Sequence, residues 1–188
     1  MKNILNSVFK TQHQSAPFEQ IQTANFIPAL ELEINKTLEE IAHICSNPET
    51  PTFGNTLESL EKSGEQLGII SGILFNLNSA ETSNELQEVT QKVAPLLTKF
   101  QNDVRLNKVL FDRIKYIFDI KETLGLDPEQ LTLIEKEYKG FVRNGALLSP
   151  EDKDKLRLID TELAQLSLSF GEHVLADSQA FELYLTDK

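Results

Sequence analysis

Apolar side chains recur at intervals of three or four positions along most of this chain of 188 residues. That spacing places them on one face of an α-helix and restricts the fold more than any other feature. The stripes predict helices over residues 26–45, 55–79, 82–104, 107–125, 127–145 and 149–176. Because the connections are short, we expect an all-α fold, a multi-helix and mainly antiparallel bundle of about six helices.

Helix starts are marked by side chains that can cap the first turn. The predicted capping residues are Asn55, Thr82, Asn107, Asp127 and Ser149. Pro128 and Pro150 follow two of them directly, in the first turn, where the missing N–H of proline is tolerated. Pro95 lies inside a predicted helix, and we expect a kink or a short break there.

The last predicted helix is the longest. At 1.5 Å per residue, about 27 residues would span ~40 Å, more than a compact bundle of this size usually needs. Its apolar stripe is expected to be buried and consists of Leu156, Ile159, Leu163, Leu166, Phe170 and Val174.

The pattern changes at both ends of the chain. Residues 1–24 form an irregular segment, residues 25–176 the helical domain, and residues 177–188 the start of a short terminal strand. In that strand Phe181, Leu183 and Leu185 alternate with polar or amphipathic neighbours. A single strand is unstable in water, so we expect this chain to be a piece of a longer protein whose next region is missing.

Three glycines, Gly64, Gly68 and Gly72, stand four residues apart in the second predicted helix. Each glycine destabilises a helix interior by up to about 1 kcal/mol relative to alanine. We therefore expect another backbone to pack closely against this glycine ridge, and Gly68→Leu to destabilise the fold. The alternative is that the glycines are merely tolerated.

The balance of charge excludes some classes of partner. The net charge is −11, from 29 acidic and 18 basic residues, so we expect no nucleic-acid binding and no attraction to an anionic membrane. No stretch approaches the roughly 20 apolar residues of a membrane span. Cys45 is the only cysteine, which fits a reducing compartment, and a cytoplasmic location is expected if Met1 is the native start.

No catalytic chemistry is visible in the residues themselves. The side chains considered for it are His13, His43, His173, Cys45, Glu39, Glu40, Glu151 and Asp152. The histidines are widely separated and lack the His-Glu-x-x-His spacing of a zinc site, and the cysteine has no evident base. The paired carboxylates are typical of helix surfaces and first turns. We therefore assign no catalytic, cofactor-binding or metal-binding residue.

The stretch PETPTFGNTLESLEKSG, residues 48–64, carries a family resemblance. It closely resembles a segment near the start of the zinc oligopeptidases of the thimet oligopeptidase, oligopeptidase A and peptidyl-dipeptidase family. That pattern is Pro-x-Pro-Thr-Phe-x-Asn-Thr, followed by a Leu-Glu-x-Ser-Gly helix. The matching residues are Pro51, Thr52, Phe53, Asn55, Thr56, Leu60, Glu61, Ser63 and Gly64. Gly54 departs from the family, which often has Glu there.

Further stretches match in the same order, so the resemblance covers about Phe18 to Leu185. They include residues 17–31, 74–89, 92–97 and 124–177. His173 stands where peptidyl-dipeptidases usually have Asn. The bacterial peptidyl-dipeptidase branch resembles the chain most, with oligopeptidase A next.

The resemblance implies a non-catalytic N-terminal domain, inactive alone, that forms a wall of the substrate channel. The zinc ligands of the family, His-Glu-x-x-His and a later Glu, lie in its C-terminal part, so none maps onto this chain. The implied partners are that catalytic region of the same polypeptide and short peptides, which the parent would hydrolyse with zinc-activated water. The alternative is a free-standing helical interaction module, against which the unpaired strand counts.

Overall fold

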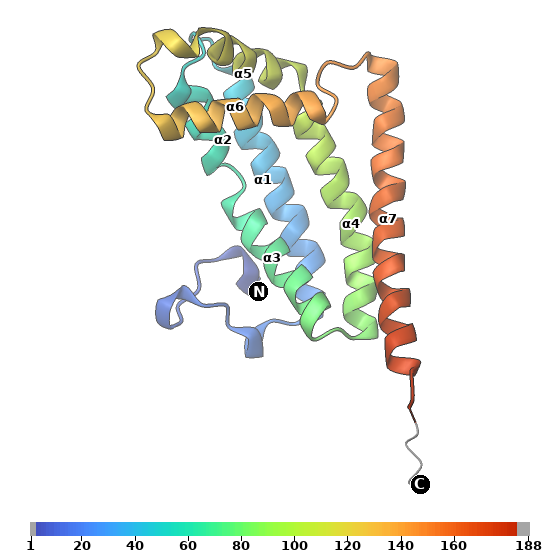
Figure 1. Ribbon diagram of the computed structural model, residues 1–188. Coiled ribbons are helices and arrows are strands. Elements are labelled where there is room, and N and C mark those ends of the chain that lie inside the picture. Colours follow the sequence, from blue (N-terminus) through green and yellow to red (C-terminus); the bar gives the residue numbers. More distant parts are fainter. Residues whose placement is uncertain (1–2, 184–188) are drawn as a thin grey trace.

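Every regular element that the structure describes is a helix. The computed structural model describes residues 3–183 (Figure 1). Its α-helices are α1 (Phe26–Ser46), α2 (Ser59–Lys62), α3 (Glu65–Ala80), α4 (Asn84–Arg105), α5 (Lys108–Ile120), α6 (Pro128–Arg143) and α7 (Pro150–Ala180). The predicted all-α fold with one long C-terminal helix is confirmed.

Capping side chains begin several of these helices where they were predicted. Asn107, Asp127 and Ser149 each accept a hydrogen bond from the backbone N–H three residues further on. Each cap satisfies a backbone N–H that the first turn of a helix leaves unpaired. The predicted cap of α4 is wrong by one position, because Ser83 and not Thr82 accepts the bond.

The predicted continuous helix over residues 55–79 is wrong. A π-helical turn at Phe53–Glu58 leads into α2, and the chain then bends before α3 begins. Gly64 occupies the left-handed region at the bend, with φ of 72°. Such a φ is strained for a residue with a Cβ, so glycine suits this position. By contrast, α4 runs through Pro95 without a break, one of the two outcomes expected there.

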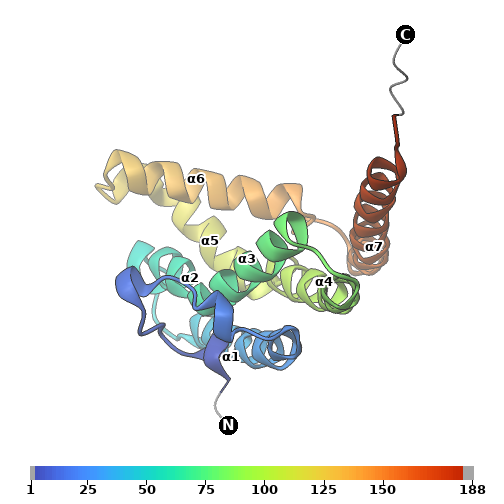
Figure 2. The ribbon, with the colours of Figure 1, turned by 90° about the horizontal axis from the view of Figure 1, so that it is seen from below.

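Four helices run along the long axis of the molecule, and two lie across one end. α1, α3, α4 and α7 extend lengthwise, with α1 antiparallel to α3, and α4 antiparallel to both α3 and α7 (Figure 1). α5 and α6 cover the end where α1 and α4 finish. Seen along the long axis, α6 and α1 lie on opposite sides of α3, and α7 lies beside α4 (Figure 2).

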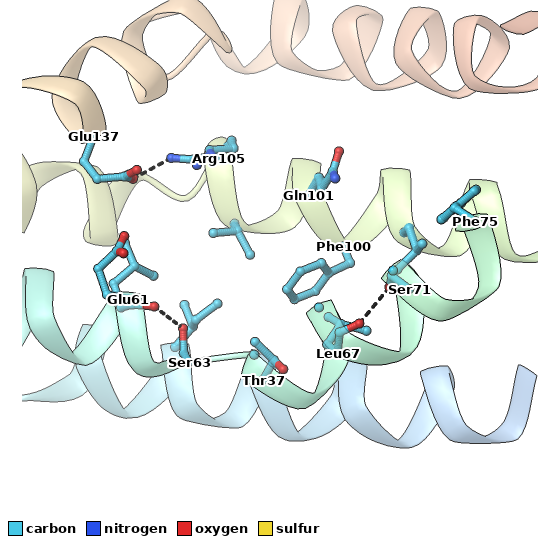
Figure 3. A pocket seen from close by; sticks show the side chains of 17 residues that line it. Thr37, Glu61, Ser63, Leu67, Ser71, Phe75, Phe100, Gln101, Arg105 and Glu137 are labelled. Atoms are coloured by element: carbon cyan, nitrogen blue, oxygen red, sulfur yellow. Dashed lines mark hydrogen bonds and ion pairs between the residues drawn. The ribbon is translucent and has the colours of Figure 1, made fainter. Parts of the chain in front are cut away.

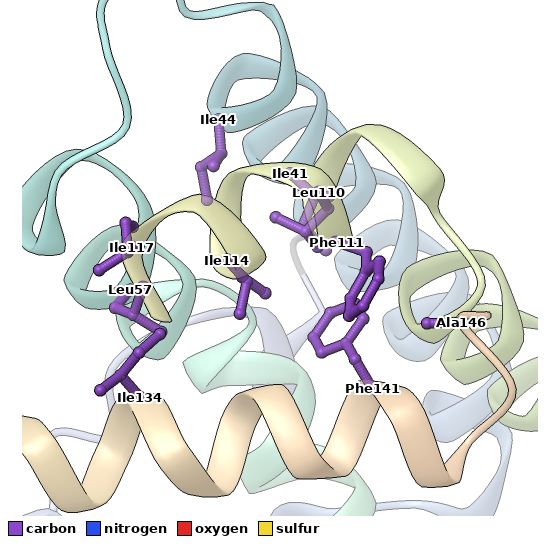
Figure 4. Close-up of a cluster of buried hydrophobic side chains, with 10 residues drawn as sticks. All are labelled: Ile41, Ile44, Leu57, Leu110, Phe111, Ile114, Ile117, Ile134, Phe141 and Ala146. Carbon is purple, nitrogen blue, oxygen red and sulfur yellow. The ribbon is translucent and has the colours of Figure 1, made fainter. Parts of the chain in front are cut away.

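A first group of buried side chains, the α5–α6 core, fills the crossed end (Figure 4). It joins the last turns of α1 to α5 and α6, because both crossing helices place apolar stripes toward it. Its members are Ile41, Ile44, Leu57, Leu110, Phe111, Ile114, Ile117, Ile134, Phe141 and Ala146.

A second group, the α3–α4 core, lies between the lengthwise helices. Its members are Leu5, Phe26, Ala29, Leu30, Leu67, Ile70, Leu74, Leu86 and Val93. Phe100 packs against both cores and so connects them. α1 contributes to each core along one stripe, which makes it the central helix of the fold.

The N-terminal segment, predicted to be irregular, consists of short 3₁₀ turns that pack onto the helices. Leu5 is fully buried in the α3–α4 core. Asn6 Nδ2 donates to the buried Glu33 Oε1 at 2.8 Å. Gln66 Nε2 donates to the carbonyl oxygen of Leu5 at 2.6 Å. These contacts fix the segment to α1 and α3.

The predicted burial of the α7 stripe is wrong. No residue of α7 is buried. The exposed fractions are 52% for Ile159, 54% for Leu163, 57% for Leu166, 71% for Phe170 and 49% for Val174. The helix packs on α4 through a different face, so periodicity identified an apolar face correctly without identifying what covers it.

The predicted terminal strand is not found in the part of the chain that the structure describes. α7 continues to Ala180, and Phe181–Leu183 has no regular structure. Leu185 and the rest of the predicted strand lie outside the described residues. No strand occurs anywhere in residues 3–183.

The stretch rich in proline between α1 and α2 is held by one buried cation. Arg113 of α5 is only 7% exposed and forms no ion pair among residues 3–183. Its guanidinium donates to the carbonyl oxygens of Asn47 and Glu49, at 2.9 and 3.4 Å. It also donates to Asn55 Oδ1 at 3.1 Å and Thr56 Oγ1 at 3.3 Å. Backbone and amide dipoles therefore compensate the charge.

The turn itself adopts its shape through a reciprocal cap. Thr52 Oγ1 accepts from the N–H of Asn55 at 3.1 Å, and Asn55 Oδ1 accepts from the N–H of Thr52 at 2.8 Å. The cap is therefore Thr52, and the prediction of Asn55 as the capping residue is wrong. Asn55 serves instead as the third residue of the capping box and as an acceptor for Arg113.

We predict that Arg113→Met lowers the free energy of unfolding by about 2–4 kcal/mol, because the acceptors of the guanidinium lose a buried partner. Urea denaturation followed by circular dichroism measures this change. Arg143→Met, at an exposed position near the end of α6, is the matched control and should shift stability by less than about 0.5 kcal/mol. Equal effects of the two variants would contradict the proposed role of Arg113.

Candidate functional site

A groove lies between α3 and α4 (Figure 3). Its volume is about 590 Å³, which lies in the range of ligand-binding clefts. We call it the α3–α4 groove. It is lined by Thr37, Ile41, Leu60, Glu61, Ser63, Gly64, Leu67, Gly68, Ser71, Gly72, Phe75, Leu97, Phe100, Gln101, Val104, Arg105 and Glu137.

The groove is open because α3 presents glycine toward it. A Cβ built on Gly68 or on Gly72 would meet nothing within 4 Å. The predicted close packing at Gly68 and Gly72 is therefore wrong, which removes the reason given for destabilisation by Gly68→Leu. Only Gly64 is crowded, since its Cβ would lie 3.0 Å from Thr37 Cγ2. The glycine spacing did mark the correct region, although the glycines leave space there.

The groove combines an apolar floor with polar groups. Leu67 and Phe100 face its interior, and Phe75 lies toward one end (Figure 3). At the other end Arg105 Nη1 and Glu137 Oε2 form an ion pair at 2.7 Å. The sequence did not predict the pairing of Arg105 with Glu137, because only the packing of α4 and α6 brings these two residues together.

The ion pair at the end of the groove is held in place by packing. The guanidinium of Arg105 also lies over the ring of Phe141, 4.9 Å from its centroid. Phe141 is fully buried in the α5–α6 core, so it restricts where the guanidinium can move. The groove thus ends at a fixed pair of opposite charges that can orient a polar ligand group.

Polar contacts attach α7 to α4 beside the groove. Arg157 Nη1 and Asp103 Oδ1 pair at 2.7 Å, and Gln91 Nε2 donates to Glu172 Oε2 at 2.7 Å. Burial alone would raise the pKa of the Asp103 carboxyl, but hydrogen bonds from Lys99 and Arg157 outweigh it and lower the pKa. Because the pKa is lower in the folded state, the ionised carboxyl stabilises the fold at pH values above its unfolded pKa of about 3.9. This stabilisation is lost as the pH falls through the folded pKa.

The side chains considered for chemistry are dispersed. His13, His43 and His173 are all exposed, each on a different element. Cys45 is half-buried, and burial raises the pKa of its thiol, although the charge of Arg113 opposes this. A raised pKa disfavours the nucleophilic thiolate.

The two pairs of carboxylates considered for chemistry lie on different helices, Glu39 and Glu40 on α1, Glu151 and Asp152 on α7. Glu40 accepts from the backbone N–H of Gly64 at 3.2 Å, so it holds the bend before α3. Glu39, Glu151 and Asp152 lie exposed on helices. The hydrogen bond from Lys155 and the bond from Ser149 lower the pKa of the Asp152 carboxyl. None of these groups lines the α3–α4 groove.

The described residues do not offer a metal site. Within residues 3–183, no three side chains of the histidine, cysteine, aspartate and glutamate types gather closely enough to hold a metal ion. A protein zinc site needs three or four such ligands in fixed geometry. Across the same range, no helix combines the length and apolar character needed to cross a bilayer.

The described residues thus form a helical domain with a groove between α3 and α4. Its family is shown by sequence comparison. Residues 23–153 match the model of the N-terminal domain of neurolysin and thimet oligopeptidase. The chain therefore belongs to this family and corresponds to its N-terminal domain.

Curated relatives agree with this assignment. The chain is 36% identical to dipeptidyl carboxypeptidase of Escherichia coli over 90% of its own length and 25% of that protein. It is 27% identical to the organellar oligopeptidase A of Arabidopsis thaliana, over 92% of this chain and 22% of that protein. With oligopeptidase A of Escherichia coli it shares 23% identity, over 95% of this chain and 26% of the relative. The predicted order, peptidyl-dipeptidase before oligopeptidase A, is confirmed.

The chain spans about a quarter of the length of these relatives. The larger part of each relative therefore has no counterpart in this chain of 188 residues.

We predict opposite effects of alanine at two glycines of the groove. Gly72→Ala should raise the free energy of unfolding by about 0.5–1 kcal/mol, because alanine favours the helix and its Cβ has space. Gly64→Ala should lower it by about 1 kcal/mol or more, because φ is positive and Thr37 is close. Thermal or urea unfolding measures both. A destabilising Gly72→Ala would restore the close-packing interpretation.

Proposed function

We propose that this chain is a non-catalytic domain of a zinc oligopeptidase or peptidyl-dipeptidase, and that it forms one wall of the channel through which short peptides reach the catalytic region. The match of residues 23–153 to the family's N-terminal domain carries this proposal. The names of the relatives, oligopeptidase and dipeptidyl carboxypeptidase, support peptides as the substrate class.

The shape of the domain supports a wall rather than a closed pocket. The α3–α4 groove extends between α3 and α4, with Phe75 toward one end and Glu137 of α6 at the other (Figure 3). An extended peptide could place apolar side chains against Phe75 and Phe100. Gln101 and the Arg105–Glu137 pair could receive its backbone or terminal charges. We propose that this face borders the peptide.

The catalytic metal would be held elsewhere in the complete protein. The described residues do not gather a ligand set, so zinc and the chemistry of water activation are assigned to the region that the relatives possess beyond the match. This domain would contribute shape, and would exclude water and large substrates from the channel. We also propose a cytoplasmic location, which the single free cysteine supports.

We predict that the purified chain of 188 residues binds no stoichiometric zinc and cleaves no peptide. Metal analysis after dialysis and a quenched-fluorescent peptide assay measure this. One tightly held zinc per chain, or turnover that follows the purified chain through successive columns, would contradict the proposal. A gene that ends without a catalytic region would instead favour the alternative of a free-standing interaction module.

We predict that groove substitutions weaken peptide binding in the complete gene product. Phe75→Ala and Gln101→Ala should raise KM by about 3–10-fold with a smaller change in kcat, because they remove binding contacts away from the reacting bond. Val109→Ala is the matched control, since Val109 is an exposed apolar residue outside the groove. Unchanged KM in both groove variants would show that the peptide does not use this face.

A further inference from the structure

The outward face of α7 carries an apolar seam that the described residues leave uncovered. Its members, which we call the α7 seam, are Leu156, Ile159, Leu163, Leu166 and Phe170. Leu156 is half-buried, and the other four are more than half exposed. Elsewhere the domain closes its apolar stripes into two cores, so the uncovered face of α7 is exceptional within the fold.

Polar contacts between α7 and α4 fix the rotation of α7 about its own axis, and this rotation leaves the α7 seam exposed. Arg157 pairs with Asp103, Glu172 accepts from Gln91, and Lys153 Nζ donates to the carbonyl oxygen of Leu106 at 3.2 Å. The face of α7 that these polar contacts hold also carries the partly buried Leu168 and Leu175. Ile159, Leu166 and Phe170 remain more than half exposed beside this face, and Leu163 lies at its border, where it lines a pocket with residues of α4.

The spacing of the seam indicates the structure of what would cover it. Its members alternate at intervals of three and four residues over 156–170. This is the spacing of the a and d positions in a heptad, which packs against a facing helix by inserting side chains between those of its partner. Side chains of a strand repeat every two residues, so a strand matches the spacing of the seam less well than a helix does. The seam therefore fits a partner helix with an apolar stripe.

The comparisons indicate where that helix comes from. The relatives are far longer than the matched part, which covers only 25% of dipeptidyl carboxypeptidase of Escherichia coli. A region of that size, joined to the same polypeptide, would have a high effective concentration near α7. A contiguous apolar face on a domain surface is typical of a buried interface.

We propose that an amphipathic helix of the region beyond the N-terminal domain, in the same polypeptide, packs along the α7 seam. This inference rests on the proposed function, since it takes the complete protein to contain that region. The interface would anchor the catalytic region to the edge of the domain formed by α7. It would leave the α3–α4 groove free for the peptide.

Cysteine labelling tests the proposal through accessibility. Leu166→Cys places a thiol on the seam, and Leu158→Cys, at a position 73% exposed and off the seam, is the matched control. Each variant is made both in the chain of 188 residues and in the complete gene product. Maleimide labelling is followed at the single peptide that contains the new thiol by mass spectrometry. Circular dichroism verifies that each variant is folded.

We expect both thiols to react at similar rates in the chain of 188 residues. In the complete product, labelling of Leu166→Cys should be slower by about ten-fold or more, with Leu158→Cys unchanged, because the covering helix must detach before the thiol reacts. Equal reactivity of both thiols in the complete product would overturn the proposal. So would protection of Leu166→Cys already in the short chain, with a dimer by light scattering, since the occupant would then be a second copy.

The same samples separate this inference from the proposed function. A complete product that protects the seam but cleaves no peptide retains the interface and contradicts the peptidase proposal. A product that cleaves peptides while Leu166→Cys reacts freely retains the peptidase proposal and overturns the seam.

Discussion

The buried guanidinium of Arg113 is the interaction on which the path of the chain depends. It joins α5 to the carbonyl groups at the end of α1 and to the turn before α2. Because this cation has no carboxylate partner among the described residues, backbone carbonyls, the Asn55 amide oxygen and the Thr56 hydroxyl compensate it in one arrangement. That arrangement fixes where α2 starts. It thereby sets the position of α3 and of the groove that α3 forms with α4.

Capping residues in the sequence predicted where several helices begin. What each helix contacts depends on the packing of segments far apart in the sequence, which the local pattern does not show. Asn107, Asp127 and Ser149 were predictable because a cap acts within one turn. The break at Gly64 was missed, since a glycine in the left-handed region cannot be told from a tolerated helical glycine by spacing alone. The α7 stripe was wrongly assigned to the core, because periodicity shows that a face is apolar without showing its partner.

The candidate site was only indirectly visible in the sequence. The glycines at 68 and 72 pointed to the right surface of α3, but whether a neighbour fills or leaves the space depends on α4 and α6. Family resemblance identified the chain as an N-terminal domain of this family, which the match of residues 23–153 confirms. The proposed division of roles rests on both: this domain would shape the channel and contact the peptide, and the reacting groups would lie in another region.

The left-handed bend at Gly64 has a consequence for how the two cores are related. Leu57, before the bend, belongs to the α5–α6 core, whereas Leu67 and Ile70, after it, belong to the α3–α4 core. In an uninterrupted helix, inserting one residue would rotate every later side chain by about 100° around the axis. The bend separates the rotational phase of α3 from that of α2. An inserted residue in α2 would therefore not rotate the side chains that α3 contributes to the α3–α4 core.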